Sequence, residues 1–102
     1  MRNDQTVIEA LLEDGWLTLE EAAALTAVEP AWLQCHIDEG RFPHARNTAG
    51  VWRVSSVGLV RAKRMRAVER DFDAVPELAA LMADLLEEMD ALRRRMRSAG
   101  LE

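Results

Sequence analysis

The fold is decided by residues 18–40, which have the sequence TLEEAAALTAVEPAWLQCHIDEG. Thr18 is followed three residues later by Glu21, the spacing of a capping box in which each side chain bonds the other residue's backbone amide. This pattern predicts a helix over about residues 19–26. Pro30 predicts the start of a second helix, because proline suits a first helical position where no amide donor is needed. Gly40 predicts the end of that helix.

Two short helices joined by a tight turn are the signature of a helix-turn-helix. In the DNA-binding versions the second helix enters a phosphate-lined groove, and much of the affinity is electrostatic. Residues 30–39 contain no Lys or Arg, and they end in Asp38 and Glu39. The helix that would read DNA therefore lacks the chemistry to do so, and the pattern favours a protein-binding role.

The segment after Gly40 predicts a change to extended structure. Residues 51–54 are rich in strand formers and follow a turn at residues 47–50, which predicts a small two-stranded wing. Ser55 or Ser56 is expected to cap a third helix that runs to about Phe72. The expected fold class is mainly α, with a winged helix-turn-helix head at residues 1–75 and a C-terminal coiled-coil helix at residues 76–102. Residues 6–13 fit either a short helix or a strand.

A heptad repeat follows Pro76. Its apolar residues alternate four and three positions apart, the spacing of a coiled-coil seam, and Ala99 continues the series. We expect this helix to pair two copies as a homodimer; the alternative is that the same face packs on the chain's own head. Acids before position 91 and arginines after it favour antiparallel pairing, although the helix macrodipole explains the same order and leaves the orientation open. The expected dimerisation residues are Leu78, Met82, Leu85, Met89, Leu92 and Met96.

Composition and charge limit the possible partners. The chain has 102 residues, of which 49 % are hydrophobic, and its formal net charge is −5. Residues 1–30 carry seven acidic residues and one basic residue, so the expected partner is basic rather than a nucleic acid or an anionic membrane. No long apolar run or apolar leader is present, which predicts a cytoplasmic protein. The candidate partner contacts are Glu9, Glu13, Asp14, Glu20, Glu29, Asp38 and Glu39.

The sequence predicts no catalytic, metal-binding or cofactor-binding site. His36 and His44 have no nucleophile and acid at a recognisable spacing, so no enzyme activity is expected. One cysteine and two histidines fall short of a closed structural zinc site. Cys35 is predicted to be a buried small hydrophobic residue.

The order of elements resembles the MerR-type winged helix. Residues 17–23 resemble the first helix of that family, residues 28–33 the turn and the start of the second helix, and residues 50–55 the end of the wing. DNA-binding members usually carry Arg-Tyr directly after the leucine of the second helix, where this chain has Gln34 and Cys35. The CbpM family of chaperone modulators shows the same departure. This chain also resembles that family in its length, in its acidity, in Trp52-Arg53-Val54 and in residues 75–84.

The resemblance to CbpM implies a dimer that binds the J-domain of a DnaJ- or CbpA-like co-chaperone and blocks its stimulation of DnaK. J-domains present a basic helix to DnaK, which suits an acidic competitor. The alternative is a MerR-type transcription regulator that grips phosphate, although only Gln34 on the second helix suits base readout. The basic residues in question could instead lie on a solvated face or pair with the acidic first third of the chain. They are Arg41, Arg46, Arg53, Arg61, Lys63, Arg64 and Arg66.

Overall fold

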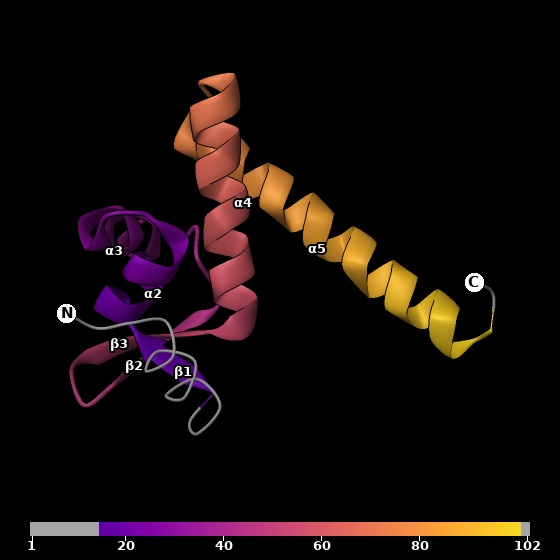
Figure 1. Ribbon diagram of the computed structural model, residues 1–102, viewed down its shortest axis with the longest axis horizontal. Coiled ribbons are helices and arrows are strands. Elements are labelled where there is room, and N and C mark those ends of the chain that lie inside the picture. The colour runs from indigo at the N-terminus through magenta and orange to yellow at the C-terminus, as the bar shows by residue number, and fades with distance from the viewer. Residues whose placement is uncertain (1–14, 101–102) are drawn as a thin grey trace.

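The computed structural model describes residues 15–100 of the chain. In chain order its elements are β1 (Trp16–Thr18), α2 (Leu19–Thr26), α3 (Pro30–Asp38), β2 (Ala45–Thr48), β3 (Val51–Ser55), α4 (Ser56–Phe72) and α5 (Pro76–Ser98). Figure 1 shows a head made of α2, α3 and the sheet beside α4, with α5 projecting away from it. The expected mainly helical fold with a long C-terminal helix is confirmed. The undecided segment at residues 6–13 lies outside the described residues.

The two helices of the helix-turn-helix begin where the local signals predict. The Thr18 Oγ1 atom accepts a hydrogen bond from the Glu21 amide at 3.2 Å, and Glu21 Oε1 accepts one from the Thr18 amide at 2.9 Å. The helix α2 ends at Thr26, and Ala27 takes a left-handed conformation with φ 56° that turns the chain towards Pro30. The first helix therefore carries its own start signal, and the second starts at its proline.

The sheet has three strands, whereas the sequence predicted a two-stranded wing. The strand β3 lies between β1 and β2 and pairs antiparallel with both. Leu17 of β1 lies opposite Val54 of β3, and both side chains are fully buried. With only three residues, β1 is too short for an alternating pattern to reveal it. Its pairing with β3 is what makes this segment a strand.

The hydrophobic core joins the head to the first half of α5. At the contact between α4 and α5 the side chains are small, since Ala62 on α4 and Ala79 and Ala83 on α5 are fully buried. Small side chains allow the two helices to approach closely. The core consists of Leu17, Leu19, Ala22, Ala23, Leu33, Phe42, Val54, Ala62, Met65, Ala79, Ala80 and Ala83.

Arg61 of α4 is buried at this helix contact and holds three segments together. Its Nη1 atom donates to Asp84 Oδ1 at 2.8 Å and to Glu87 Oε2 at 3.0 Å, both on α5. Its Nε and Nη2 atoms donate to the backbone carbonyl of Arg41 at 3.2 and 2.7 Å. We call this set of contacts the Arg61 clamp. It fixes α5 and the segment after α3 to α4.

The sequence suggested that the basic residues of the middle of the chain pair with the acidic first third. For Arg61 and Arg64 this is wrong. The acidic partners of Arg61 lie on α5, and Arg64 pairs with Asp90 of α5 at 2.9 Å. His44 also contacts α5, with its Nε2 atom 3.1 Å from Glu87 Oε1. The acidic residues in the middle of α5 therefore pair with Arg61 and Arg64 of α4 and contact His44 of the adjoining loop.

Replacing Arg61 by Met is expected to lower the free energy of unfolding by about 2–3 kcal/mol. Removing one partner of a buried ion pair leaves the other unpaired, and the largely exposed Asp84 keeps the loss below the full buried-pair value. Urea denaturation followed by circular dichroism measures the change. The matched control is Arg70→Met, because Arg70 is exposed and its one ion pair within residues 15–100 is with its neighbour Asp71. Equal losses in the two variants would contradict the role given to the clamp.

Candidate functional site

The outward face of α3 carries short side chains and one acid. Ala31, Gln34, Cys35 and Asp38 recur at three- and four-residue spacing, so they share one face of the helix. Ala31, Cys35 and Asp38 are exposed, and Gln34 is half-buried and donates a hydrogen bond from Nε2 to Asp38 Oδ1 at 2.8 Å. The face that a DNA-binding helix-turn-helix would turn to the groove is thus neutral to acidic.

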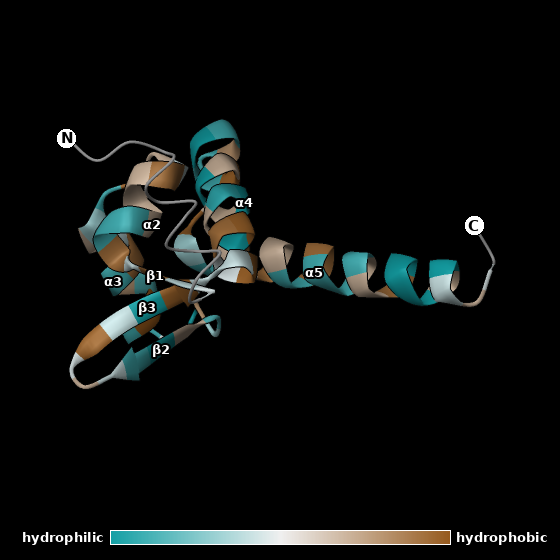
Figure 2. Ribbon diagram, turned by 60° about the horizontal axis from the view of Figure 1, so that its bottom comes forward, coloured by the Kyte–Doolittle hydropathy of each residue, from teal (hydrophilic) through white to brown (hydrophobic). Residues whose placement is uncertain are grey.

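A shallow depression lies beside this face, where α2, α3 and the wing meet. Its volume is about 220 Å³. Val51, at the start of β3, is 43 % exposed, and Trp52 is half-buried. Figure 2 shows this hydrophobic part of β3 beside the hydrophilic β2. The depression is lined by Leu19, Glu20, Gln34, Gly50, Val51 and Trp52.

Four of the seven predicted contact acids lie in the described residues, and all four are exposed. Glu20 and Gln34 both line the depression. Asp38 accepts a hydrogen bond from Gln34, and Glu39 follows Asp38 in the chain. Glu29 lies at the opposite end of α3. The structure therefore places Glu20 and Asp38 beside Gln34, with Glu39 adjacent to Asp38 at the end of α3, and it leaves Glu29 apart. The remaining predicted contacts, Glu9, Glu13 and Asp14, lie outside the described residues.

The apolar part of this surface was missed from the sequence. Val51 and Trp52 were assigned to the wing by their strand propensity, which does not say which of them faces solvent. Gln34 was considered only as a side chain that could hydrogen-bond to DNA bases. We define the acidic α3 surface as the depression together with its acidic edge, formed by Glu20, Asp38 and Glu39. Exposed apolar side chains beside polar and charged ones are found in protein–protein interfaces.

The opposite face of α3 is anchored to α4 by His36. The His36 Nε2 atom lies 3.0 Å from Glu69 Oε2, and its Nδ1 atom accepts a hydrogen bond from Arg41 Nε at 3.0 Å. Because Nδ1 accepts, Nε2 carries the proton and the imidazole is neutral. Trp32 Nε1 donates to the other oxygen of Glu69 at 2.9 Å. Burial lowers the pKa of His36; Glu69 acts in the opposite direction, and Arg41 and Arg61 lower it further.

Cys35 is exposed, so the prediction of a buried small hydrophobic residue is wrong. Leu33 and His36 occupy the inward face of α3, and this turns position 35 outwards. In the wing, the Arg46 guanidinium carbon lies 4.2 Å from the centre of the Trp16 ring, so this arginine is engaged within the head.

Within residues 15–100 no three His, Cys, Asp or Glu side chains are grouped closely enough to hold a metal ion. None of the helices in that same range combines the length and hydrophobicity needed to cross a membrane.

The stability of the head is expected to fall as the pH drops below about 6.5, the ordinary pKa of histidine. A lowered pKa in the folded state means that the unfolded chain binds the proton first. The stabilisation is therefore complete above the unfolded pKa and is lost as the pH falls through the folded pKa of His36. A protonated Nδ1 would also face the Arg41 guanidinium. Urea midpoints between pH 7.5 and 5 measure the change.

The matched control is His36→Gln, whose amide can still donate to Glu69 and does not titrate. The difference in unfolding free energy between wild type and this variant should shrink steadily as the pH falls. Parallel pH profiles for the two proteins would contradict the assignment, because His44 and the carboxylates are common to both.

Comparison with known proteins agrees with this geometry. A family model described as a helix-turn-helix domain matches residues 16–67, from β1 to the middle of α4. No curated protein and no solved structure shows significant similarity to the chain. The matched segment covers just over half of the chain and includes both helices of the motif and the wing. The chain belongs to the helix-turn-helix domain family.

Proposed function

We propose that this chain is a non-catalytic modulator that binds the J-domain of a DnaJ- or CbpA-like co-chaperone and inhibits its stimulation of DnaK. The observation that carries the proposal is the acidic α3 surface. It occupies the place where a DNA-binding helix-turn-helix would present basic side chains to the phosphates of DNA. The resemblance of Gln34-Cys35, the wing exit and residues 75–84 to the CbpM family supports this partner. A J-domain offers a basic helix of complementary charge.

The electrostatics of the head favour a basic protein over DNA. Inserting α3 into a groove would bring Asp38 and Glu39 against phosphate, where the protein gains no counterion release and meets repulsion. Arg46 lies on the Trp16 ring, and Arg61 and Arg64 are paired with carboxylates of α5. The basic residues that would grip a phosphate backbone are thus partly engaged within the chain.

The alternative function is DNA-binding transcription regulation of the MerR type. One observation favours it: Lys63 and Arg66 line a hollow between α4 and the end of α2, and they form no ion pair within residues 15–100. Arg70 continues this basic side of the helix. The basic side lies on α4 rather than on α3, so it supports backbone contact without readout of bases.

The double variant Asp38→Lys and Glu39→Lys tests the proposed surface. Reversing rim charges is expected to slow association with a J-domain and to flatten the salt dependence of the association rate, because such charges mainly steer the encounter. Biosensor kinetics between 50 and 300 mM salt measure both effects. The same variant should lose inhibition of J-domain-stimulated ATP hydrolysis by DnaK.

The matched control is the double variant Asp71→Lys and Glu88→Lys, which makes the same change in net charge at exposed positions on α4 and α5. It should retain both binding and inhibition. Failure of the wild type to bind any J-domain would overturn the proposed partner. Binding that ignores salt and the reversals at 38 and 39 would overturn the proposed surface, and a sequence-specific DNA complex that survives competitor DNA would establish the alternative.

A further inference from the structure

A groove lies in the angle between α4 and α5, and its volume is about 320 Å³. One wall is apolar, because Val57 and Val60 of α4 are 51 % and 46 % exposed and lie on the same face of the helix. Figure 1 shows α5 crossing α4 and then running away from it, so the angle opens towards the start of α4. The groove is lined by His44, Val57, Val60, Arg64, Glu87, Asp90 and Arg94.

The α5 wall of the groove is the side of this helix opposite to its heptad residues, which we call the heptad face. At 3.6 residues per turn the heptad face lies between about 140° and 220° around the helix axis from Glu87. Its residues are between 38 % and 52 % exposed, so the alternative that they pack on the chain's own head is wrong. An occupant of the groove therefore does not compete with the heptad face. The heptad face consists of Leu78, Met82, Leu85, Met89, Leu92 and Met96.

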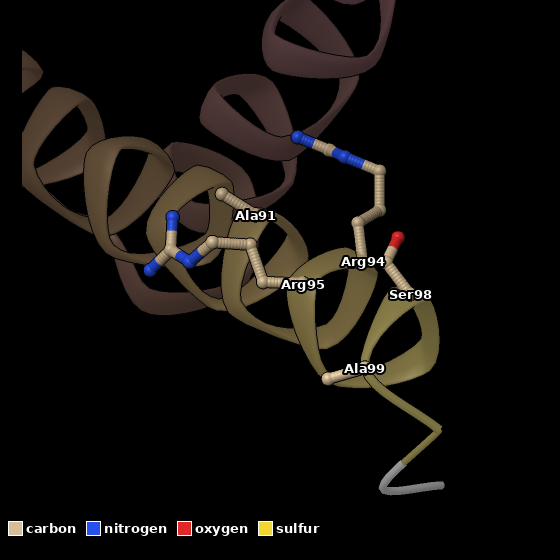
Figure 3. A pocket seen from close by; sticks show the side chains of 5 residues that line it. All are labelled: Ala91, Arg94, Arg95, Ser98 and Ala99. Carbon is tan, nitrogen blue, oxygen red and sulfur yellow. The ribbon is translucent and has the colours of Figure 1, made fainter.

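The groove continues along α5 into a second hollow of about 580 Å³, and the two share Arg94. Figure 3 shows Arg94 and Ser98 extending to the same side of α5. Arg94 and Arg95 form no ion pair within residues 15–100, whereas the other basic side chains of the groove contact acids of α5. The open end of the groove therefore offers apolar contact on one wall and available positive charge on the other.

We propose that residues 7–12 of the same chain occupy this groove, with their apolar side chains packed on Val57 and Val60. The segment lies outside the described residues, and its sequence is VIEALL. Its large apolar side chains are spaced so that a helix would carry them on one face. This docking goes beyond the proposed function and is independent of J-domain binding. The apolar side chains are Val7, Ile8, Leu11 and Leu12.

The sheet directs the segment to the groove. The strand β1 runs antiparallel to β3, and Trp16 lies opposite Ser55, the residue at which β3 passes into α4. The chain that precedes Trp16 therefore continues past the end of β3, alongside the start of α4. Val57 and Val60 lie within about 8 Å of Ser55 along the axis of α4. Leu12 is four residues before Trp16, and four extended residues span up to about 14 Å, so Leu12 is within reach of both valines.

The acids of the segment suit the α5 wall of the groove. Glu9 and Glu13 are four residues apart, so a helix would place them side by side at the edge of the apolar face. There they meet the positive charge of Arg94 and Arg95. The acidic α3 surface lies at the other end of β3, beside Val51. Docking in the groove therefore keeps Glu9 and Glu13 apart from that surface, although both were predicted as partner contacts.

Nuclear Overhauser effects between methyl groups test the docking in the full-length wild type. They are expected between the methyl groups of Leu11 or Leu12 and those of Val57 or Val60. A sample that mixes labelled and unlabelled copies separates contacts within one chain from contacts between copies. The absence of any effect between residues 7–12 and the two valines would overturn the proposal. Effects found only between copies would also overturn it, because the occupant would then be a second copy.

Cleavage after Glu9 by a glutamate-specific protease tests the same contact through its energetics. Val60→Lys is expected to raise the cleavage rate roughly tenfold or more, because losing a buried valine contact increases the undocked population on which the protease acts. The matched control is Phe72→Lys, which makes the same kind of change at a 76 % exposed position at the far end of α4 and should leave the rate unchanged.

Circular dichroism checks that the head stays folded in both variants. If wild type, Val60→Lys and Phe72→Lys were cleaved after Glu9 at the same rate, the docking of residues 7–12 would be wrong, whatever the outcome of J-domain binding.

Discussion

The buried guanidinium of Arg61 is the interaction on which the arrangement of the molecule depends. A charge removed from water is tolerated only when its partners are well placed, so Asp84, Glu87 and the Arg41 carbonyl must hold their positions together. Two of these groups lie on α5, at positions three residues apart. Fixing both leaves α5 little freedom to rotate about its own axis. The outward direction of the heptad face is thus set by a contact on the other side of the helix.

The packing of the helix-turn-helix does not depend on the outward face of α3. Leu33, His36 and Trp32 hold α3 against α4 through the core and through Glu69. None of these contacts involves the outward positions 31, 34, 35 and 38, so the packing of α3 on α4 does not dictate the side chains there. The fold family therefore describes the scaffold, and the partner has to be argued from the exposed side chains.

Local signals in the sequence predicted the local structure. The capping box at Thr18, the proline at position 30 and the serines at 55 and 56 placed the starts of α2, α3 and α4, because each signal acts within one helical turn. The third strand was missed since only its pairing with a distant segment defines it. Cys35 was misplaced because residue type was used where helix phase decides the direction of a side chain.

The ion-pair partners of Arg61 could not be predicted from the sequence either, because they also lie far away along the chain. Its partners are 20 to 26 residues away, and its neighbours Lys63, Arg64 and Arg66 made the helix resemble a solvated basic face. Composition could show an excess of base in the middle of the chain and of acid at its end. It could not show that burial would join one arginine to two of those acids. For the same reason the acids at 84, 87 and 90 were treated as charges for pairing with a second copy.

The heptad face and the acidic α3 surface share no residue, and they lie on separate parts of the molecule (Figure 1). The α3 face belongs to the head, whereas the second half of α5 extends beyond it. The homodimer expected from the heptad residues of α5 would therefore carry two acidic surfaces, neither of them covered by the contact between the two copies. A single J-domain would meet the same contacts on a monomer as on the dimer. Pairing would strengthen binding only to a partner that is itself dimeric, and only where that partner's geometry permits both heads to engage at once.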